Sequence, residues 1–309
     1  MISVYLDTNV WIDIAWAWYG RNSRSRHKAV ATYLADSVRR RIVRLPLSYF
    51  HCFEMLKHED HAWRDRLWKF AVSLSNCTGL LNRQCIQDAL IEEAVCRIFC
   101  VTSGRSQLDP YTNSGLFGLP LEGQFPLTDL CLRTPEGWTS FWLDMPEETR
   151  EQLFSGLINS ERSFVKRRNN LKSSWTDEDY TTRKRAYIAR LFLDLQDSYL
   201  HATTKIGKRP EDIESLSMED KIRLVTEVPP LDVEVGLATQ HLQQWDRLEE
   251  VNDVRDIGHL CMAIPYCDVV VTERYWVDKI ERERMDERYK TILLSDMSDL
   301  ETTIEKERK

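Results

Sequence analysis

The sequence of 309 residues lacks the features of a membrane or exported protein. It contains no apolar run near the roughly 18 residues that a transmembrane helix needs, so no membrane span is expected. Asp7 and Asp13 interrupt the segment that would have to form the apolar core of a signal peptide. These absences predict a cytoplasmic protein with no membrane partner.

Several common catalytic patterns are also missing. None of the eight cysteines forms a C-x-x-C pair, which argues against a zinc ribbon, and disulfides are not expected in a reducing compartment. The chain has no P-loop, no G-x-G-x-x-G pattern and no Ser-His-Asp order, so nothing points to a nucleotide cofactor or a hydrolase triad.

Composition and charge are those of an ordinary soluble protein. Hydrophobic residues make up 42% and charged residues 29% of the chain, which is long enough for one elaborated domain or two smaller ones. The net charge of −7 argues against nonspecific coating of nucleic acid. It does not exclude a nuclease, because bound cations offset active-site carboxylates and local basic surface can hold phosphates.

The N-terminal residues read as the start of a wound α/β sheet. Residues 3–7 form a short buried strand, followed by helices at 9–19 and 28–39. Residues 42–45 form a second strand, ended by a proline, and a serine then caps a helix through residue 57. This β-α-α-β-α order is typical of an α/β domain.

The α/β pattern returns near the C-terminus, with strands at 268–272 and 291–294. Between the two α/β regions the sequence is first rich in glycine and proline. It then becomes helical in pattern and highly charged. We therefore expect one α/β domain made of residues 1–101 and 251–309, with an insertion at 102–250.

Two early acids stand where a sheet-edge site would need them. Asp7 ends the first strand, where open α/β sheets place their ligands, and Thr8 and Asn9 add polar groups. The alternative is that Asp7 only caps the following helix. Glu54 lies at the margin of an apolar helix face, where the alternative is a solvated glutamate.

Two later segments add further acids. Asp253 and Asp256 share the first turn of a helix, where negative charge is favourable whatever its function; Asp253 suits the cap position. Asp268 and Glu273 lie at opposite ends of one strand, roughly 16 Å apart. In a parallel sheet the carboxyl end joins Asp7, so Glu273, with Thr272 beside it, is the expected site residue.

These segments resemble, in order and spacing, the successive motifs of PIN-domain nucleases. The motifs are the strand followed by Asp7-Thr-Asn, Pro-Leu-Ser-Tyr-Phe-His-Cys-Phe-Glu54, Asp256-Ile-Gly-His-Leu and Val-Val-Val-Thr-Glu273. The resemblance covers about residues 1–60 and 250–300. It implies a three-layer α/β/α sandwich with a mostly parallel central sheet, here carrying a large helical insertion.

The resemblance also implies Mg²⁺- or Mn²⁺-dependent hydrolysis of phosphodiester bonds, most often in RNA. It carries metal-site roles onto Asp7, Glu54, Asp256 and Glu273, although the last position is usually aspartate in that family. Asp7 and Asp256 would bind the ion directly, and the two glutamates directly or through water. Supporting roles in orienting carboxylates or waters fall to four residues: Thr8, Asn9, Asp253 and Thr272.

A basic stretch follows Asp7 and is the better candidate for holding nucleic acid. Its expected phosphate ligands are Arg21, Arg24, Arg26, Lys28 and Arg44. A second basic stretch runs from Arg162 to Arg190. For each stretch the alternative is a solvated helix face.

The sequence therefore predicts a metal-dependent endoribonuclease with RNA as its substrate. Many members of the resembled family act as toxins or in RNA processing and quality control, and a defence role is carried by the resemblance alone. One alternative is a structure-selective DNA nuclease. Another is a catalytically inactive PIN-like scaffold that binds RNA or protein, which the glutamate at position 273 keeps open. An inhibitory or regulatory protein partner and oligomerisation also stay open.

Overall fold

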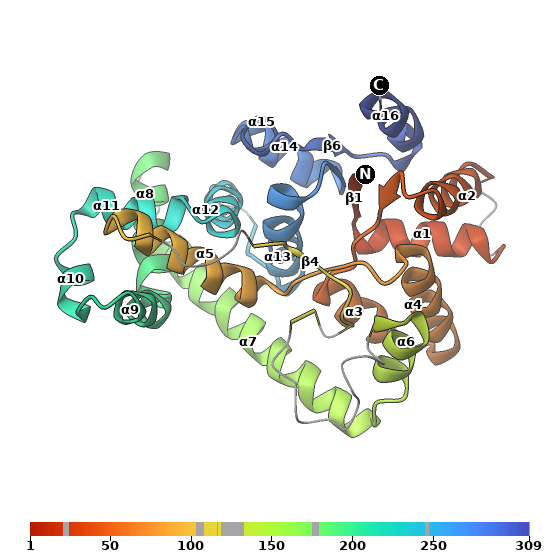
Figure 1. The fold of residues 1–309 in the computed structure, drawn as a ribbon, viewed down its shortest axis with the longest axis horizontal. Coiled ribbons are helices and arrows are strands. Elements are labelled where there is room, and N and C mark those ends of the chain that lie inside the picture. Colours follow the sequence, from red (N-terminus) through yellow and green to blue (C-terminus); the bar gives the residue numbers. More distant parts are fainter. Residues whose placement is uncertain are drawn as a thin grey trace. The chain divides into compact units, whose positions relative to one another are not determined.

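The structure is a computed structural model that describes residues 1–20, 25–102, 108–115, 117–118, 133–174, 179–244 and 247–308. These residues form a mixed α/β chain that is mostly helical and divides into two compact units (Figure 1). The first unit comprises Met1–Asn82, Pro110–Leu157 and Met262–Lys309, and the second comprises Arg83–Asp109 and Ile158–Cys261. In the described parts of the chain, no helix is both long and apolar enough to cross a bilayer.

A four-stranded parallel sheet organises the first unit. Its strands are ordered β2 (Val43–Arg44), β1 (Ile2–Leu6), β5 (Val269–Val271) and β6 (Ile292–Leu294). Val4 lies opposite Val269, and Val269 lies opposite Ile292. β1 and β5 are almost fully buried, as expected for central parallel strands that read as continuous apolar runs. The predicted parallel sheet, assembled from both ends of the chain, is confirmed.

Helices and one small antiparallel pair of strands complete the first unit. The helices are α1 (Thr8–Trp18), α2 (Ser25–Arg39), α3 (Tyr49–Leu56), α4 (His61–Ser75), α6 (Pro135–Leu143), α14 (Arg274–Arg282), α15 (Met285–Tyr289) and α16 (Leu300–Glu307), with a short 3₁₀ helix, η2 (Met297–Asp299). β3 (Gly79–Leu80) pairs antiparallel with β4 (Tyr111–Thr112), and β4 lies inside a segment expected to be loop. Large buried tryptophans fill the core beside these helices: Trp11, Trp63, Trp68, Trp138 and Trp142.

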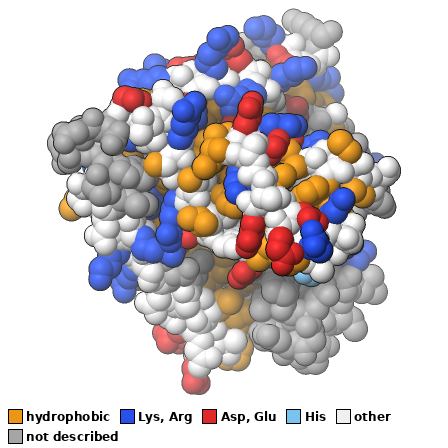
Figure 2. All heavy atoms as spheres, turned by 90° about the vertical axis from the view of Figure 1, so that its left-hand side faces the viewer, with side chains coloured by type: hydrophobic (Ala, Val, Ile, Leu, Met, Phe, Trp, Pro, Cys, Tyr) orange, Lys and Arg blue, Asp and Glu red, His pale blue; other side chains and the backbone are white. Residues whose placement is uncertain are grey.

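The second unit is built from helices around its own apolar core. It contains α5 (Arg83–Ile98), α8 (Tyr180–Asp194), α9 (Gln196–Lys205), α10 (Pro210–Glu214), α11 (Met218–Thr226) and α12 (Pro229–Leu242). α7 (Glu147–Ser174) and α13 (Val251–Tyr266) each contribute residues to both units. Acidic and basic side chains lie interspersed among hydrophobic ones on the face drawn in Figure 2.

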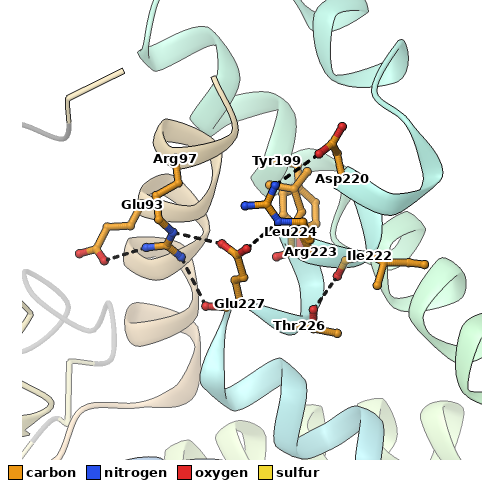
Figure 3. A network of polar contacts seen from close by, with 9 residues as sticks. All are labelled: Glu93, Arg97, Tyr199, Asp220, Ile222, Arg223, Leu224, Thr226 and Glu227. Atoms are coloured by element: carbon orange, nitrogen blue, oxygen red, sulfur yellow. Dashed lines mark hydrogen bonds and ion pairs between the residues drawn. The ribbon is translucent and has the colours of Figure 1, made fainter. Parts of the chain in front are cut away.

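The division of the chain differs from the predicted boundaries at 101 and 251. α5 was expected in the α/β domain, but Ile91, Ala94 and Val95 pack into the core of the second unit. Arg97 of α5 also donates to Glu227, at the end of α11, over 3.2 Å (Figure 3). An apolar helix face shows that a helix packs, but not against which core.

The segment Pro110–Leu157 was expected in the insertion and belongs instead to the first unit. Phe117 and Trp138 pack edge to face, with ring centroids 5.1 Å apart. They close over Gly79, where an added Cβ would lie 2.9 Å from the Phe117 ring. A glycine is therefore required at this point of β3, and the aromatic pair attaches the segment to the sheet domain.

Candidate active site at the carboxyl edge of the sheet

Asp7 connects the carboxyl ends of the two central strands. Its backbone N–H donates to the Val271 carbonyl over 3.0 Å, and its carboxylate accepts from the Thr272 hydroxyl over 3.0 Å. Asp7 occupies the N-cap position of α1, yet within the described residues of that helix its side chain makes no capping hydrogen bond. The carboxylate is therefore hydrogen-bonded across the sheet edge, whereas a helix cap would turn it towards α1.

The next two residues bond to the other two predicted acids of this unit. The Thr8 hydroxyl donates to the Glu54 carboxylate, which comes from α3, and the Asn9 amide donates to the Glu273 carboxylate over 3.1 Å. Asp7 and Glu54 are half-buried, whereas Glu273 is exposed. One three-residue turn thus positions carboxylates from three segments distant in sequence.

His51, which its place three residues before Glu54 made a minor candidate for substrate contact, is buried and fixes α3 against β1. The Ser48 N–H donates to Nδ1 of His51 over 2.9 Å, which leaves the Nε2–H to donate to the Leu6 carbonyl over 2.7 Å. Because Glu54 lies one helical turn after His51, this contact sets the distance of Glu54 from the end of β1. The signal in the sequence was a histidine on the apolar face, three residues before the glutamate.

The phenol of Tyr5 lies within electrostatic reach of the same edge. Burial raises the pKa of Tyr5 well above its usual range, and the negative charges of Asp7 and Glu54 raise it further. Tyr5 therefore stays protonated, and its hydroxyl is hydrogen-bonded to the Ser48 hydroxyl at 3.0 Å. Both carboxylates act on one buried group, which shows that they share a neighbourhood.

Asp296 is an acid at this edge that the sequence analysis did not consider. It follows β6, whose carboxyl end lies beside that of β5. Its carboxylate accepts the Ser298 N–H over 2.8 Å and so caps η2. This hydrogen bond lowers the pKa of Asp296, and the positive charge of Arg26 lowers it further. Its geometry is that of a cap, in contrast to that of Asp7.

The remaining predicted acids, Asp253 and Asp256, belong to the second unit. Asp253 is buried, and its carboxylate accepts from the Glu250 N–H over 2.8 Å and from the Arg247 guanidinium over 2.6 Å. It is therefore the third residue of α13, bonded back to the residue before the helix, and not the N-cap that the sequence suggested. Asp256 is half-buried on α13, and its metal-site role stays a prediction.

The predicted phosphate ligands fall into three groups. Arg26 and Lys28 are exposed at the start of α2. Arg21 and Arg24 lie outside the described residues. Arg44 stacks its guanidinium on the Tyr111 ring, 3.4 Å from the ring centroid.

The position of Arg44 differs from the expected one. In the sheet register it lies opposite Ser3, near the amino end of β1. Four strand residues, about 13 Å, separate Ser3 from Asp7. Arg44 is thus set back from the carboxyl edge, because β2 begins level with β1 and ends after two residues.

The donor types at the edge suit a hard divalent cation. Asp7, Glu54 and Glu273 offer carboxylate oxygens, the preferred ligands of Mg²⁺ and Mn²⁺. Within the described residues, no group of three or more His, Cys, Asp and Glu side chains is gathered closely enough to hold a metal ion. Mg²⁺ takes only one or two carboxylates and keeps several waters, so an ion of this kind does not need such a group.

Comparisons with known proteins give no independent assignment. No protein-family model matches the chain, and no curated protein and no solved structure matches it. The functional interpretation therefore rests on the sequence motifs and on the geometry around Asp7.

Proposed function

We propose that this protein is a metal-dependent endoribonuclease whose first unit has a PIN-like α/β/α sandwich fold. One observation carries the proposal: Asp7 turns away from its helix to Thr272, while Thr8 and Asn9 hold Glu54 and Glu273. A helix cap or a solvated glutamate requires none of these contacts between residues distant in sequence. A site that holds a cation against a phosphodiester requires all of its carboxylates to be oriented.

In this proposal the side chains at the edge have distinct tasks. A bound Mg²⁺ or Mn²⁺ would supply charge stabilisation and lower the pKa of a water molecule. Asp7 and Glu54 would hold the ion, directly or through water. The hydroxyls of Thr272 and Thr8 fix the rotamers of these two carboxylates without neutralising them. Glu273, the exposed acid, would accept hydrogen bonds from metal-bound water.

Asp256 is proposed as a further ligand on the resemblance alone. An Asp256→Asn variant tests this role separately from the first unit. A loss of cleavage comparable to that of Asp7→Asn would place both residues in one site, whereas wild-type activity would confine the site to the acids of the first unit.

The substrate class is tested by a matrix of nucleic acids and metals. Purified protein is incubated with labelled single-stranded RNA, single-stranded DNA and branched DNA, each with Mn²⁺, Mg²⁺ or EDTA. We expect RNA cleavage with either metal and none with EDTA. Cleavage of DNA alone would favour the structure-selective DNA nuclease, and RNA binding without cleavage under any condition would favour the inactive scaffold.

Biological context is proposed on the same resemblance. A toxin, an RNA-processing enzyme or a defence nuclease acting in the cytoplasm would each use this activity, and a toxin would need an inhibitory protein partner. The toxicity of expressing the protein in a bacterial host, compared between wild type and Asp7→Asn, distinguishes a toxin from the other two roles.

A further inference from the structure

A pocket of about 600 Å³ lies in the first unit where α1, α2 and α4 end. Figure 1 shows these three helices next to one another. The volume is typical of small-ligand sites. Its walls include aromatic and basic side chains: Trp18, Tyr19, Phe70, Arg39, Arg41 and Lys69. Among the described lining residues, none is acidic.

The aromatic walls are held in place yet open to solvent. Trp18 and Tyr19 remain 43% and 42% exposed, unusually high for such large rings. Phe70 supports both, with centroid distances of 5.8 Å to Trp18 and 6.1 Å to Tyr19. The Tyr19 hydroxyl donates to the Arg66 carbonyl over 3.5 Å. Rings fixed from behind and exposed in front form a surface on which a base can stack.

The pocket cations are only partly explained by the helices that end there. Arg39 lies in the last turn of α2, where a helix carboxyl end favours positive charge. Arg41 follows that helix, and Lys69 precedes the end of α4 by more than one turn, beyond the range of the helix dipole. Both are exposed and available to a phosphate.

We propose that this pocket binds a nucleotide unit of single-stranded RNA, with its base stacked on Trp18 and its phosphate held by Arg41 and Lys69. The identity of the ligand as RNA rests on the proposed function. The pocket lies at the opposite end of α1 from Asp7, about 16 Å away along the helix. It would therefore hold a part of the substrate remote from the cleaved bond.

The test measures binding without cleavage. A fluorescently labelled RNA hexamer is titrated in EDTA with the Asp7→Asn protein and with that protein carrying a second change. Trp18→Leu is compared with Trp16→Leu, since Trp16 is also exposed on α1 but does not line the pocket. Arg41→Ala is compared with Arg40→Ala, which also lies outside the lining. Adenosine monophosphate and inorganic phosphate serve as competitors.

We expect Trp18→Leu to weaken binding about tenfold and Arg41→Ala severalfold, with a shallower salt dependence for the latter and little change in the two controls. Competition by the mononucleotide would identify a site that also accepts free nucleotides, and its failure a site that needs the longer strand. Equal affinities for Trp18→Leu and Trp16→Leu, or no binding at all, would overturn the inference.

Failure of the nuclease proposal can be distinguished from failure of the pocket proposal. If wild-type protein binds the hexamer through Trp18 but cleaves no RNA with Mn²⁺, the pocket stands and the nuclease proposal falls. If it cleaves RNA and the Trp18→Leu variant binds normally, the reverse holds. Competition by phosphate without any effect of Trp18→Leu would reduce the pocket to a general anion contact and overturn its role as a nucleotide site.

Discussion

The carboxylates at the sheet edge of the first unit and the buried carboxylates of the second unit have different hydrogen-bond donors. At the sheet edge of the first unit, Asp7 and Glu54 accept hydrogen bonds from threonine hydroxyls. In the second unit, buried acids are matched with arginines: Glu161 with Arg255, Glu234 with Arg83, Glu249 with Arg168 and Asp253 with Arg247. A hydroxyl orients a carboxylate and leaves its charge in place, whereas an arginine neutralises it.

A carboxylate oriented by a hydroxyl keeps the negative charge that the proposed cation site requires, whereas the buried acids of the second unit are paired with arginines. Residue type alone does not separate the two, because both regions contain many acids. The contrast predicts that charge removal costs activity in the first unit and stability in the second.

The largest stability effect is expected from Arg255→Met. Nε and Nη2 of the Arg255 guanidinium donate to the two oxygens of the Glu161 carboxylate over 3.0 and 2.7 Å, and both side chains are buried. Removal of the arginine leaves a buried charge without its partner, so the free energy of unfolding should fall by about 3–5 kcal/mol. Urea unfolding, with exposed Arg185→Met as the control, measures this; an unchanged midpoint would contradict the assigned role.

Glu54→Gln should reduce activity and leave stability almost unchanged. It keeps the size of the side chain but removes its charge, so RNA cleavage should fall on the order of 100-fold while stability changes by less than about 1 kcal/mol. Single-turnover cleavage and urea unfolding of the same preparation measure both quantities. A variant that loses stability but keeps its cleavage rate would show that Glu54 is a structural residue.

His51→Ala tests how the edge is built. The change removes the donor to the buried Leu6 carbonyl and the acceptor for the Ser48 N–H, so the free energy of unfolding should fall by about 2 kcal/mol. The exposed His61→Ala serves as the control. Rescue of stability by His51→Gln, beyond that of alanine, would support the hydrogen-bonding role, and equal stabilities for His51→Ala and His61→Ala would contradict it.

Glu249 gives the second unit a pH dependence. Its carboxylate lies 2.8 Å from the Arg168 guanidinium, but among the described residues neither carboxylate oxygen makes a hydrogen bond of good geometry. Burial therefore outweighs the attraction of Arg168 and raises the pKa of Glu249 to about 7.

The sign of the resulting effect follows from proton binding. Between the usual pKa of 4.5 and the raised value of about 7, the folded state binds more protons than the unfolded state, so stability falls as the pH rises. We expect a loss on the order of 2 kcal/mol from pH 5 to pH 8. Glu249→Gln should flatten this profile in urea unfolding, and an identical profile in the variant would contradict the assignment.

Much of the fold was predictable from local pattern. The apolar runs before Asp7 and Thr272 indicated parallel strands, and the packing of β1 against β5 confirms them. The unit boundaries were not predictable, because the apolar face of α5 does not reveal which core covers it. β3 and β4 are two residues long each, too short for alternation to show.

The site was predictable in part. The sequence indicated that Asp7, Thr8 and Asn9 lie at one sheet edge, but not that Asp7 forgoes the helix cap for Thr272. That choice depends on the neighbouring strand, as does the position of Arg44, which the register with Ser3 sets back from the edge. Side-chain direction across strands is a tertiary property that local spacing does not contain.

The most direct test is the rate of Mn²⁺-dependent cleavage of single-stranded RNA by wild type, Asp7→Asn and Asp13→Asn. Asp13 lies on the same helix and is the matched control for loss of one acidic side chain. The account predicts cleavage by wild type and Asp13→Asn, and a loss of about 1,000-fold or more in Asp7→Asn. Equal cleavage by all three proteins, or cleavage that persists in EDTA, would contradict it.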